Sequence, residues 1–171
     1  MILNIAHPDP MIYQTVDKFD FTNPPTDPIE LAHDLAQTII QHDALGLAAN
    51  QAGLPYRVFG IRAEKIIVCF NPTIVDSSEE TVYLDEGCLS FPGLMLKVKR
   101  PETIKVRYTE PNGNVITTKF SGMTSRVFQH ELDHLDGITF LNRASRLEVE
   151  RGKQMQKKRM RKMKRMLIDK L

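Results

Sequence analysis

Two stretches of the chain carry apolar residues at the spacing of a helix. In the first stretch these residues lie four positions apart, at Leu31, Leu35 and Ile39. Asp27 precedes them as an N-cap acid, Pro28 takes the first helical position, and Glu30 follows three residues after the cap. These residue types are typical of a helix start. The pattern therefore predicts a helix from Pro28 to about Asp43.

The second helical pattern begins near Met123 and ends at Gly137, a residue suited to a C-cap. Its apolar positions are Val127, Phe128, Leu132 and Leu135. Between the two helices lie short apolar or alternating runs typical of strands: Arg57–Ile61, Lys65–Phe70, Leu94–Lys99, Thr103–Tyr108 and Val115–Phe120. Pro111–Asn114 has the composition of a hairpin turn. Mostly antiparallel strands packed around a central helix, with two or three helices in all, predict an α+β fold.

The composition is that of one globular domain. The chain has 171 residues, of which 42% are hydrophobic and 26% are charged. No apolar run approaches the roughly 20 residues that span a bilayer, and Met1–Ile5 has no charged region ahead of an apolar one. The two cysteines are too few for a disulfide framework. We therefore expect a cytoplasmic protein with reduced thiols, no membrane span and no secretory leader.

The net charge of +2 is unevenly distributed along the chain. Residues 143–171 contain 12 Lys and Arg against 3 Asp and Glu, a net +9, which leaves −7 for residues 1–142. From Lys153 onward, apolar residues recur at helical spacing among the basic ones: Met160, Met163, Leu167 and Leu171. We expect an acidic body, residues 1–142, and a basic amphipathic helical extension, residues 143–171, with a break or hinge at Gly152.

Such a basic extension suits a polyanion, either nucleic acid or an anionic membrane surface. The alternative is a helix that packs on the acidic body through its Met and Leu side chains.

The segment Gln129–His134 carries the main candidate chemistry. His130 and His134 lie four residues apart on the second predicted helix, so their side chains are neighbours and can offer two nitrogens to one metal ion. Glu131 follows the first histidine, a position suited to proton transfer to and from water at a metal. The alternative to a metal site is that the two histidines lie on an ordinary polar face of the helix. Val127 shares approximately that face, which favours a face that is at least partly buried.

A third protein ligand is needed, since catalytic metal sites usually hold three and keep one position open. Cys88 is the candidate because it lies among glycines and polar residues in Asp85–Gly93. Cys69 lies in the apolar run Ile66–Phe70 and is expected in the core. A thiolate would make the site softer than that of common proteases. The alternative for Cys88 is a strand-end residue packed beneath a turn.

Three separated motifs resemble those of the peptide deformylase family. Residues 44–51 match GxGLAAxQ except that Ala44 replaces the first glycine, residues 86–90 match EGCLS, and residues 129–137 match QHExDHLxG. The similarity covers roughly residues 1–142. If the replaced glycine serves a positive φ, Ala44 is expected to alter packing near the substrate groove.

The resemblance implies a metal-dependent hydrolase that removes the N-formyl group from the N-terminal formylmethionine of nascent polypeptides and releases formate. The implied metal ligands are Cys88, His130 and His134. Glu131 is implied to take and return the proton of the attacking water. The side-chain amide of Gln51 and the backbone N–H of Leu89 are implied to donate hydrogen bonds to the oxyanion.

The resemblance also implies the substrate, the metal and a partner. The peptide would bind as an added strand alongside Leu45 and Gly46 and across from Gly87, with Val127 and Leu45 as candidates for the methionine pocket. The implied metal is Fe²⁺ in the cell, with Zn²⁺, Ni²⁺ or Co²⁺ possible in purified protein, because the ligand types alone accept zinc readily. The extension resembles basic C-terminal helices of the family that dock on ribosomal RNA.

Three alternatives stay open from the residues themselves. The chain could be an inactive relative of the family. It could be another HExxH metallohydrolase such as a zinc endopeptidase, which would normally use a histidine or glutamate as its third ligand. It could also be an RNA-binding module with a structural metal, which would require a fourth protein ligand beyond Cys88, His130 and His134.

Overall fold

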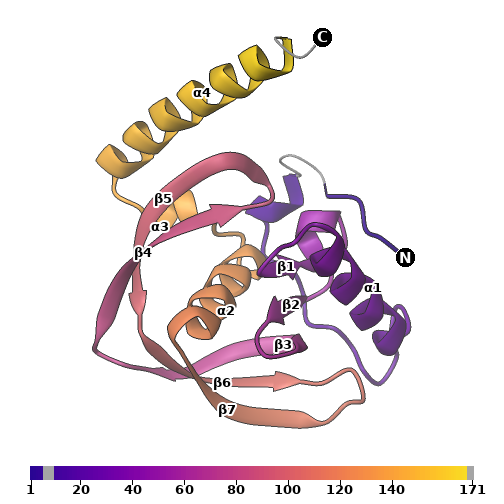
Figure 1. Cartoon of the computed structure of the whole chain (residues 1–171). Coiled ribbons are helices and arrows are strands. Elements are labelled where there is room, and N and C mark those ends of the chain that lie inside the picture. The colour runs from indigo at the N-terminus through magenta and orange to yellow at the C-terminus, as the bar shows by residue number, and fades with distance from the viewer. Residues whose placement is uncertain (6–9, 169–171) are drawn as a thin grey trace.

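A helix lies at the centre of the molecule, with β-strands curving around it (Figure 1). The computed structural model describes residues 1–5 and 10–168. In chain order the elements are η1 (Pro10–Tyr13), α1 (Pro28–Gln41), β1 (Gly46–Ala48), η2 (Ala49–Ala52), β2 (Val58–Arg62), β3 (Ile66–Ser77), β4 (Thr81–Cys88), β5 (Phe91–Pro101), β6 (Thr103–Thr109), β7 (Val115–Ser121), α2 (Gly122–Leu135), α3 (Phe140–Arg143) and α4 (Arg146–Ile168).

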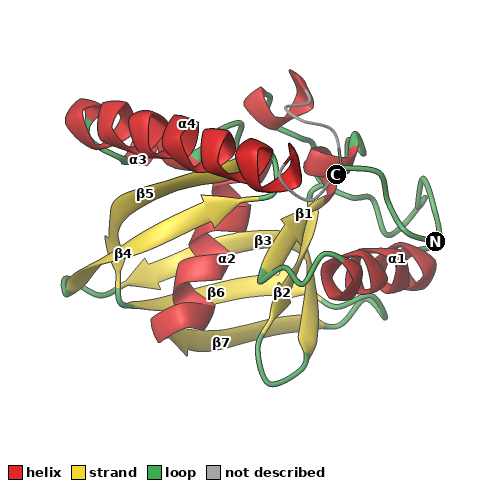
Figure 2. Ribbon diagram, turned by 45° about the horizontal axis from the view of Figure 1, so that its top comes forward, coloured by secondary structure: helices red, strands yellow, loops and turns green. Residues whose placement is uncertain are grey.

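Two antiparallel sheets surround the central helix α2. The larger sheet has the strand order β1-β2-β3-β6-β7, and the smaller sheet pairs β4 with β5. Helix α2 contacts β1, β2, β6 and β7 of the larger sheet and β5 of the smaller one. Figure 2 shows α2 crossing the strands in this arrangement. The predicted α+β fold of antiparallel strands around a central helix is confirmed.

The first helix begins where its capping residues predict. The Asp27 carboxylate accepts hydrogen bonds from the backbone N–H groups of Ile29 at 2.8 Å and Glu30 at 3.0 Å, which satisfies two amides that a helix start leaves unpaired. The helix ends at Gln41, two residues before the predicted end. Asp43 then adopts a positive φ of 47° and directs the chain into β1.

The five predicted strands correspond to β2, β3, β5, β6 and β7, and Pro111–Asn114 lies in the turn between β6 and β7. The hydrophobic pattern did not predict β1 or β4. Strand β1 has three residues, too few to show a period, and most of β4 is exposed or half-buried, so little apolar alternation marks it. Strand β3 extends to Ser77 through five exposed residues that pair with β6 across two register shifts.

The basic extension forms one helix, α4, and the break expected at Gly152 is wrong. Gly152 is buried, and a Cβ atom there would lie 2.3 Å from Leu96 Cδ2 and 3.0 Å from the Met95 carbonyl oxygen. The glycine therefore allows α4 to approach β5 closely. Leu171 lies outside the described residues, as do the side chains of Met163 and Leu167. In the described part of the chain, no helix combines the length and hydropathy needed to cross a bilayer.

Candidate metal centre

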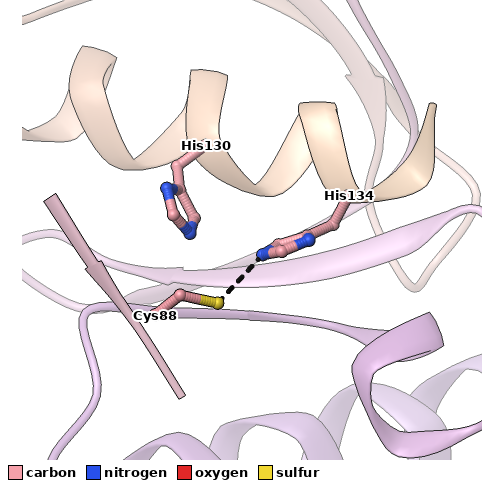
Figure 3. Close-up of side chains that lie close together, drawn as sticks. All are labelled: Cys88, His130 and His134. Carbon is pink, nitrogen blue, oxygen red and sulfur yellow. Dashed lines mark hydrogen bonds between the residues drawn. The ribbon is translucent and has the colours of Figure 1, made fainter. Parts of the chain in front are cut away.

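Cys88, His130 and His134 meet at one point between the two sheets (Figure 3). Their ligand atoms all lie within 4.8 Å of one another, and His134 Nε2 is 3.3 Å from Cys88 Sγ. The two histidines are one turn apart on α2, and Cys88 is the last residue of β4. The helix spacing and the strand end thus bring together the three residues that the motifs suggested.

The donor set fits a metal ion. One sulfur and two imidazole nitrogens are ligands for zinc and other soft or borderline transition metals, and three protein ligands leave a position for water or substrate. Among the described residues, no fourth His, Cys, Asp or Glu joins this group. Burial lowers the pKa of His134, which favours the neutral imidazole that coordinates a metal. These features are those of an open site rather than a closed structural one.

Glu86 orients His130. Its carboxylate lies 2.9 Å from His130 Nδ1, which leaves Nε2 of that ring for the metal, as in carboxylate–histidine–metal arrangements. Glu86 also accepts hydrogen bonds from Arg100 at 2.6 and 2.9 Å and from Arg126 at 2.9 Å. Burial opposes ionisation of Glu86, but the hydrogen bonds from His130 and Arg100 outweigh it and hold the pKa of this carboxyl well below its usual range.

The second carboxylate of this buried network is that of Asp133 on α2. Asp133 accepts a hydrogen bond from Arg100 at 2.8 Å and two from Arg143 at 2.6 and 3.1 Å. Arg100 therefore links β4, β5 and α2 through two carboxylates. Sequence reasoning gave Glu86 and Asp133 no role, although both lie inside the recognised motifs. The available signal was that both carboxylates lie within a few residues of a candidate metal ligand. The arginines that pair with them are distant in sequence, so the sequence did not show the pairing.

Gln51 points its amide nitrogen toward the thiol. Its Oε1 accepts a hydrogen bond from the Ala48 backbone N–H at 2.9 Å. Its Nε2 donates to Ser90 Oγ at 3.1 Å and lies 3.4 Å from Cys88 Sγ. The acceptor end is thus held by β1 and η2, and the donor end faces the metal centre. Ser90 is a further contact that sequence reasoning missed.

Glu131 is buried with an open hydrogen-bonding position. The residue is 4% exposed, and Oε2 has no hydrogen-bond partner among the described residues. Burial raises the pKa of Glu131 to about 7. Gly46 of β1 lies against it, since a Cβ atom at residue 46 would be 2.5 Å from Glu131 Oε1. A carboxylate in this setting is suited to exchanging a proton with a bound molecule near neutral pH.

The end of α2 is anchored to the segment that carries Gln51. Asn50 Nδ2 donates to the His134 carbonyl oxygen at 2.6 Å. Within the described residues, Asn50 Oδ1 and His134 Nδ1 are buried without a hydrogen-bond partner. The hydrogen bond from Asn50 ties His134 to η2 and so couples the positions of His134 and Gln51.

A cavity of about 550 Å³ opens beside these groups. It brings together the predicted substrate-binding and catalytic residues and two of the predicted metal ligands: Leu45, Gly46, Gln51, Gly87, Cys88, Leu89, His130 and Glu131. Val127, which together with Leu45 is a candidate for the methionine pocket, also lines it. Among the described residues, positive φ outside glycine occurs at Asp43 and Asn71, so the strain considered for Ala44 does not arise. The positive φ lies one residue earlier.

Comparisons with known proteins agree with one another. The family model described as "Polypeptide deformylase" matches residues 2–150. The chain is 39% identical over 120 residues to "Peptide deformylase 1" of Nostoc sp., an alignment that covers 67% of this chain and 64% of that relative. The chain thus spans less than two thirds of the length of this curated relative.

Two solved structures of the class I type b peptide deformylase from Acinetobacter baumannii are similar in fold. The actinonin-bound structure has a TM-score of 0.79 at 31% identity and covers 85% of this chain and 99% of that one. The structure with Met-ala-ser bound has a TM-score of 0.76 at 28% identity and covers 84% and 98%.

Proposed function

The chain belongs to the peptide deformylase family, and we propose that it removes the N-formyl group from the N-terminal formylmethionine of nascent polypeptides and releases formate. The observation that carries the proposal is the convergence of Cys88, His130 and His134 beside the buried Glu131 and the donor end of Gln51. We propose residues 1–142 as the catalytic domain and residues 143–171 as its extension, acting in the cytoplasm where nascent chains are made.

The proposed metal ligands are Cys88 Sγ and one ring nitrogen from each of His130 and His134. When bound there, a divalent ion supplies Lewis acidity, which can lower the pKa of water to about 7 and polarise the formyl oxygen. We propose Fe²⁺ in the cell, as the family resemblance implies, with Zn²⁺, Ni²⁺ or Co²⁺ in purified samples. Elemental analysis after anaerobic purification tests the choice, and stoichiometric zinc under those conditions would overturn it.

Glu131 is the proposed acid–base residue. Its Oε2 has no hydrogen-bond partner in the described part of the chain, so it is available to accept the proton of the attacking water. The water oxygen bonds to the formyl carbon, the carbon–nitrogen bond breaks, and the amine leaves with the proton that Glu131 carried. The products are formate and a free methionine N-terminus, so atoms and protons balance.

Gln51 and Leu89 are the proposed oxyanion donors. The amide of Gln51 is held at its acceptor end by Ala48, so its N–H groups are oriented before substrate arrives, and Leu89 lines the same cavity. Loss of one such donor typically lowers the rate by about 10²–10³.

The proposed peptide site lies between β1 and β4. Strand β1 is an edge of the larger sheet and β4 belongs to the two-stranded sheet, so an extended peptide could add beside Leu45 and Gly46 and face Gly87. The Acinetobacter baumannii relative with Met-ala-ser bound supports a site for a short methionyl peptide. Val127 and Leu45 are proposed to contact the methionine side chain, since both line the cavity.

The test is formate release from formyl-Met-Ala-Ser by full-length protein loaded with iron anaerobically or with nickel. Glu131→Gln should abolish activity while it retains the metal. Glu79→Gln, on an exposed residue, is the matched control and should stay active. A folded, metal-loaded protein without activity would instead indicate an inactive relative. A zinc endopeptidase is not favoured because the proposed third ligand is a sulfur. A structural metal site is not favoured because the group found among residues 1–5 and 10–168 has three protein ligands and lacks the fourth that would close it.

We also propose that α4 docks on ribosomal RNA. Its C-terminal half carries exposed basic residues, including Lys162, Lys164 and Arg165, and phosphate contacts by such residues weaken steeply as salt rises. Co-sedimentation with ribosomes at low and high salt tests this with full-length protein and a variant that reverses these three charges. Equal pelleting of the two proteins at low salt would overturn the docking proposal.

A further inference from the structure

One wall of the cavity is only partly held by its own sheet. Residues 92–95, here called the wall segment, all line the cavity beside the metal centre. In the pairing of β4 with β5, the register shifts between Gly87 and Cys88. The pairs that flank this shift leave residues 92–94 with no partner in β4. The backbone of residues 92–94 therefore needs contacts outside β4 to keep its position.

Helix α4 supplies those contacts. Gln156 Nε2 donates a hydrogen bond to the Pro92 carbonyl oxygen at 2.6 Å, and Arg159 Nη1 lies 3.5 Å from the Gly93 carbonyl oxygen. Figure 2 shows α4 lying along β5 on the outer side of the smaller sheet. Both acceptor carbonyls therefore belong to residues that have no partner in β4.

The close approach of α4 depends on two further features. Gly152 faces Leu96 and the Met95 carbonyl oxygen without room for a Cβ atom. One turn earlier, the Glu148 carboxylate accepts a hydrogen bond from the Lys97 backbone N–H at 3.0 Å. The helix is thus fixed to β5 at Lys97, packs tightly at Gly152, and reaches the wall segment at Gln156.

We propose that the first half of α4 braces the wall of the substrate cavity, with Gln156 as a positioning residue that acts through the Pro92 carbonyl. This inference rests on the proposed deformylase function. Gln156 does not touch the reacting atoms. It holds a segment of backbone that substrate would otherwise have to order on binding. The metal ligands lie on α2 and at the end of β4, so the brace affects peptide binding and leaves the metal centre unchanged.

Steady-state kinetics of nickel-loaded, full-length variants with formyl-Met-Ala-Ser test the proposal. Gln156→Ala should raise KM about two- to tenfold, the range that corresponds to one lost hydrogen bond, with kcat and metal content unchanged. Gln156→Lys keeps a donor and should restore most of the wild-type KM. Gln154→Ala, an exposed glutamine on the same helix, is the matched control and should leave KM unchanged.

Gly152→Ala tests the brace by a second route, because the added Cβ should lift α4 from β5. It should raise KM in the same direction as Gln156→Ala, and thermal unfolding should show that the variant is folded. Adding Gln156→Ala to it should raise KM less than the two single effects predict, since both changes act on one contact surface.

Hydrogen–deuterium exchange separates failure of the brace from failure of the proposed function. In Gln156→Ala, deuterium uptake should rise in peptides that cover residues 91–96, and in Gln154→Ala it should match the wild type. If the wild type released no formate, the proposed function would fail while uptake still reported on the brace. Unchanged uptake refutes the brace. An unchanged KM in an active enzyme, or an equal rise in both glutamine variants, refutes the positioning role of Gln156.

Discussion

Gly46→Ala should separate catalysis from folding, because the space at Gly46 is filled by the proposed acid–base residue. A Cβ atom at residue 46 would lie 2.5 Å from Glu131 Oε1, 2.8 Å from Glu131 Cγ and 2.7 Å from Val127 Cγ1. All three separations are shorter than an ordinary contact. Glu131 and Val127 are 4% and 6% exposed and both line the cavity, so the added methyl group should push both side chains toward the proposed substrate site.

The size of the effect follows from what must move. Overpacking a buried site typically costs about 1–3 kcal/mol of unfolding free energy, which for a chain of this size lowers Tm by about 2–12 °C. Displacing the Glu131 carboxylate removes proton transfer, which typically contributes about 10²–10⁴ in rate. We therefore expect kcat for formyl-Met-Ala-Ser to fall at least about 100-fold in a protein that remains folded and binds one metal ion.

The control is the same substitution in the neighbouring strand. Gly60 pairs with Leu47, and a Cβ atom there would closely approach only the Ile39 Cδ1 methyl, at 2.6 Å. Gly60→Ala should lose comparable stability but keep its kcat. Formate release, thermal unfolding and elemental analysis of both variants provide the comparison. If Gly46→Ala kept a kcat within a few-fold of Gly60→Ala, the close contact between β1 and Glu131 would not matter for catalysis and the reasoning would be wrong.

Three further predictions concern the buried network, an ionisation and a thiol. Glu86→Gln removes the charge that faces two arginines and a histidine, and it should lower the free energy of urea unfolding by about 3–5 kcal/mol, whereas Glu79→Gln should not change it. Burial raises the pKa of Tyr108 to about 12 from 10.0, so its contribution to stability is complete below about pH 10 and is lost as pH rises toward 12. Urea unfolding at about pH 9 and about pH 11 should show a larger loss for wild type than for Tyr108→Phe, and equal losses would contradict this. Burial also raises the pKa of the Cys69 thiol, so alkylation of the native protein near pH 8 should spare Cys69 until denaturant is added, as mass spectrometry of the labelled peptides would show.

Local patterns predicted the elements whose cause is local. The Asp27 cap and the proline after it predicted the start of α1 because capping depends on neighbours in the chain. The spacing of His130 and His134 predicted two metal ligands, because residues four apart are neighbours on any helix. The polar, glycine-rich surroundings of Cys88 made it the candidate third ligand, the motif resemblance implied the same role, and the structure brings it to the two histidines.

The parts that sequence reasoning missed depend on contacts between distant segments. Strand β4 shows little alternation of apolar and polar residue types, since its buried position is the charged Glu86, so only its pairing with β5 reveals it. Glu86 gains its role from Arg100 and Arg126, which are 14 and 40 residues away. The local sequence does not indicate that a charged residue is buried, because its burial depends on partners from distant segments.

Gly152 gives the clearest difference between the two levels. Taken alone, a glycine in a helical stretch indicates a break, because glycine weakens a helix. In the tertiary structure α4 continues through Gly152, since the missing side chain lets the helix approach Leu96 and the Met95 carbonyl. The sequence by itself thus determined the candidate metal ligands, the central helix and the basic character of the extension. Only the tertiary structure decided that the extension lies against the part of β5 that lines the cavity, because packing depends on the surface that the helix meets.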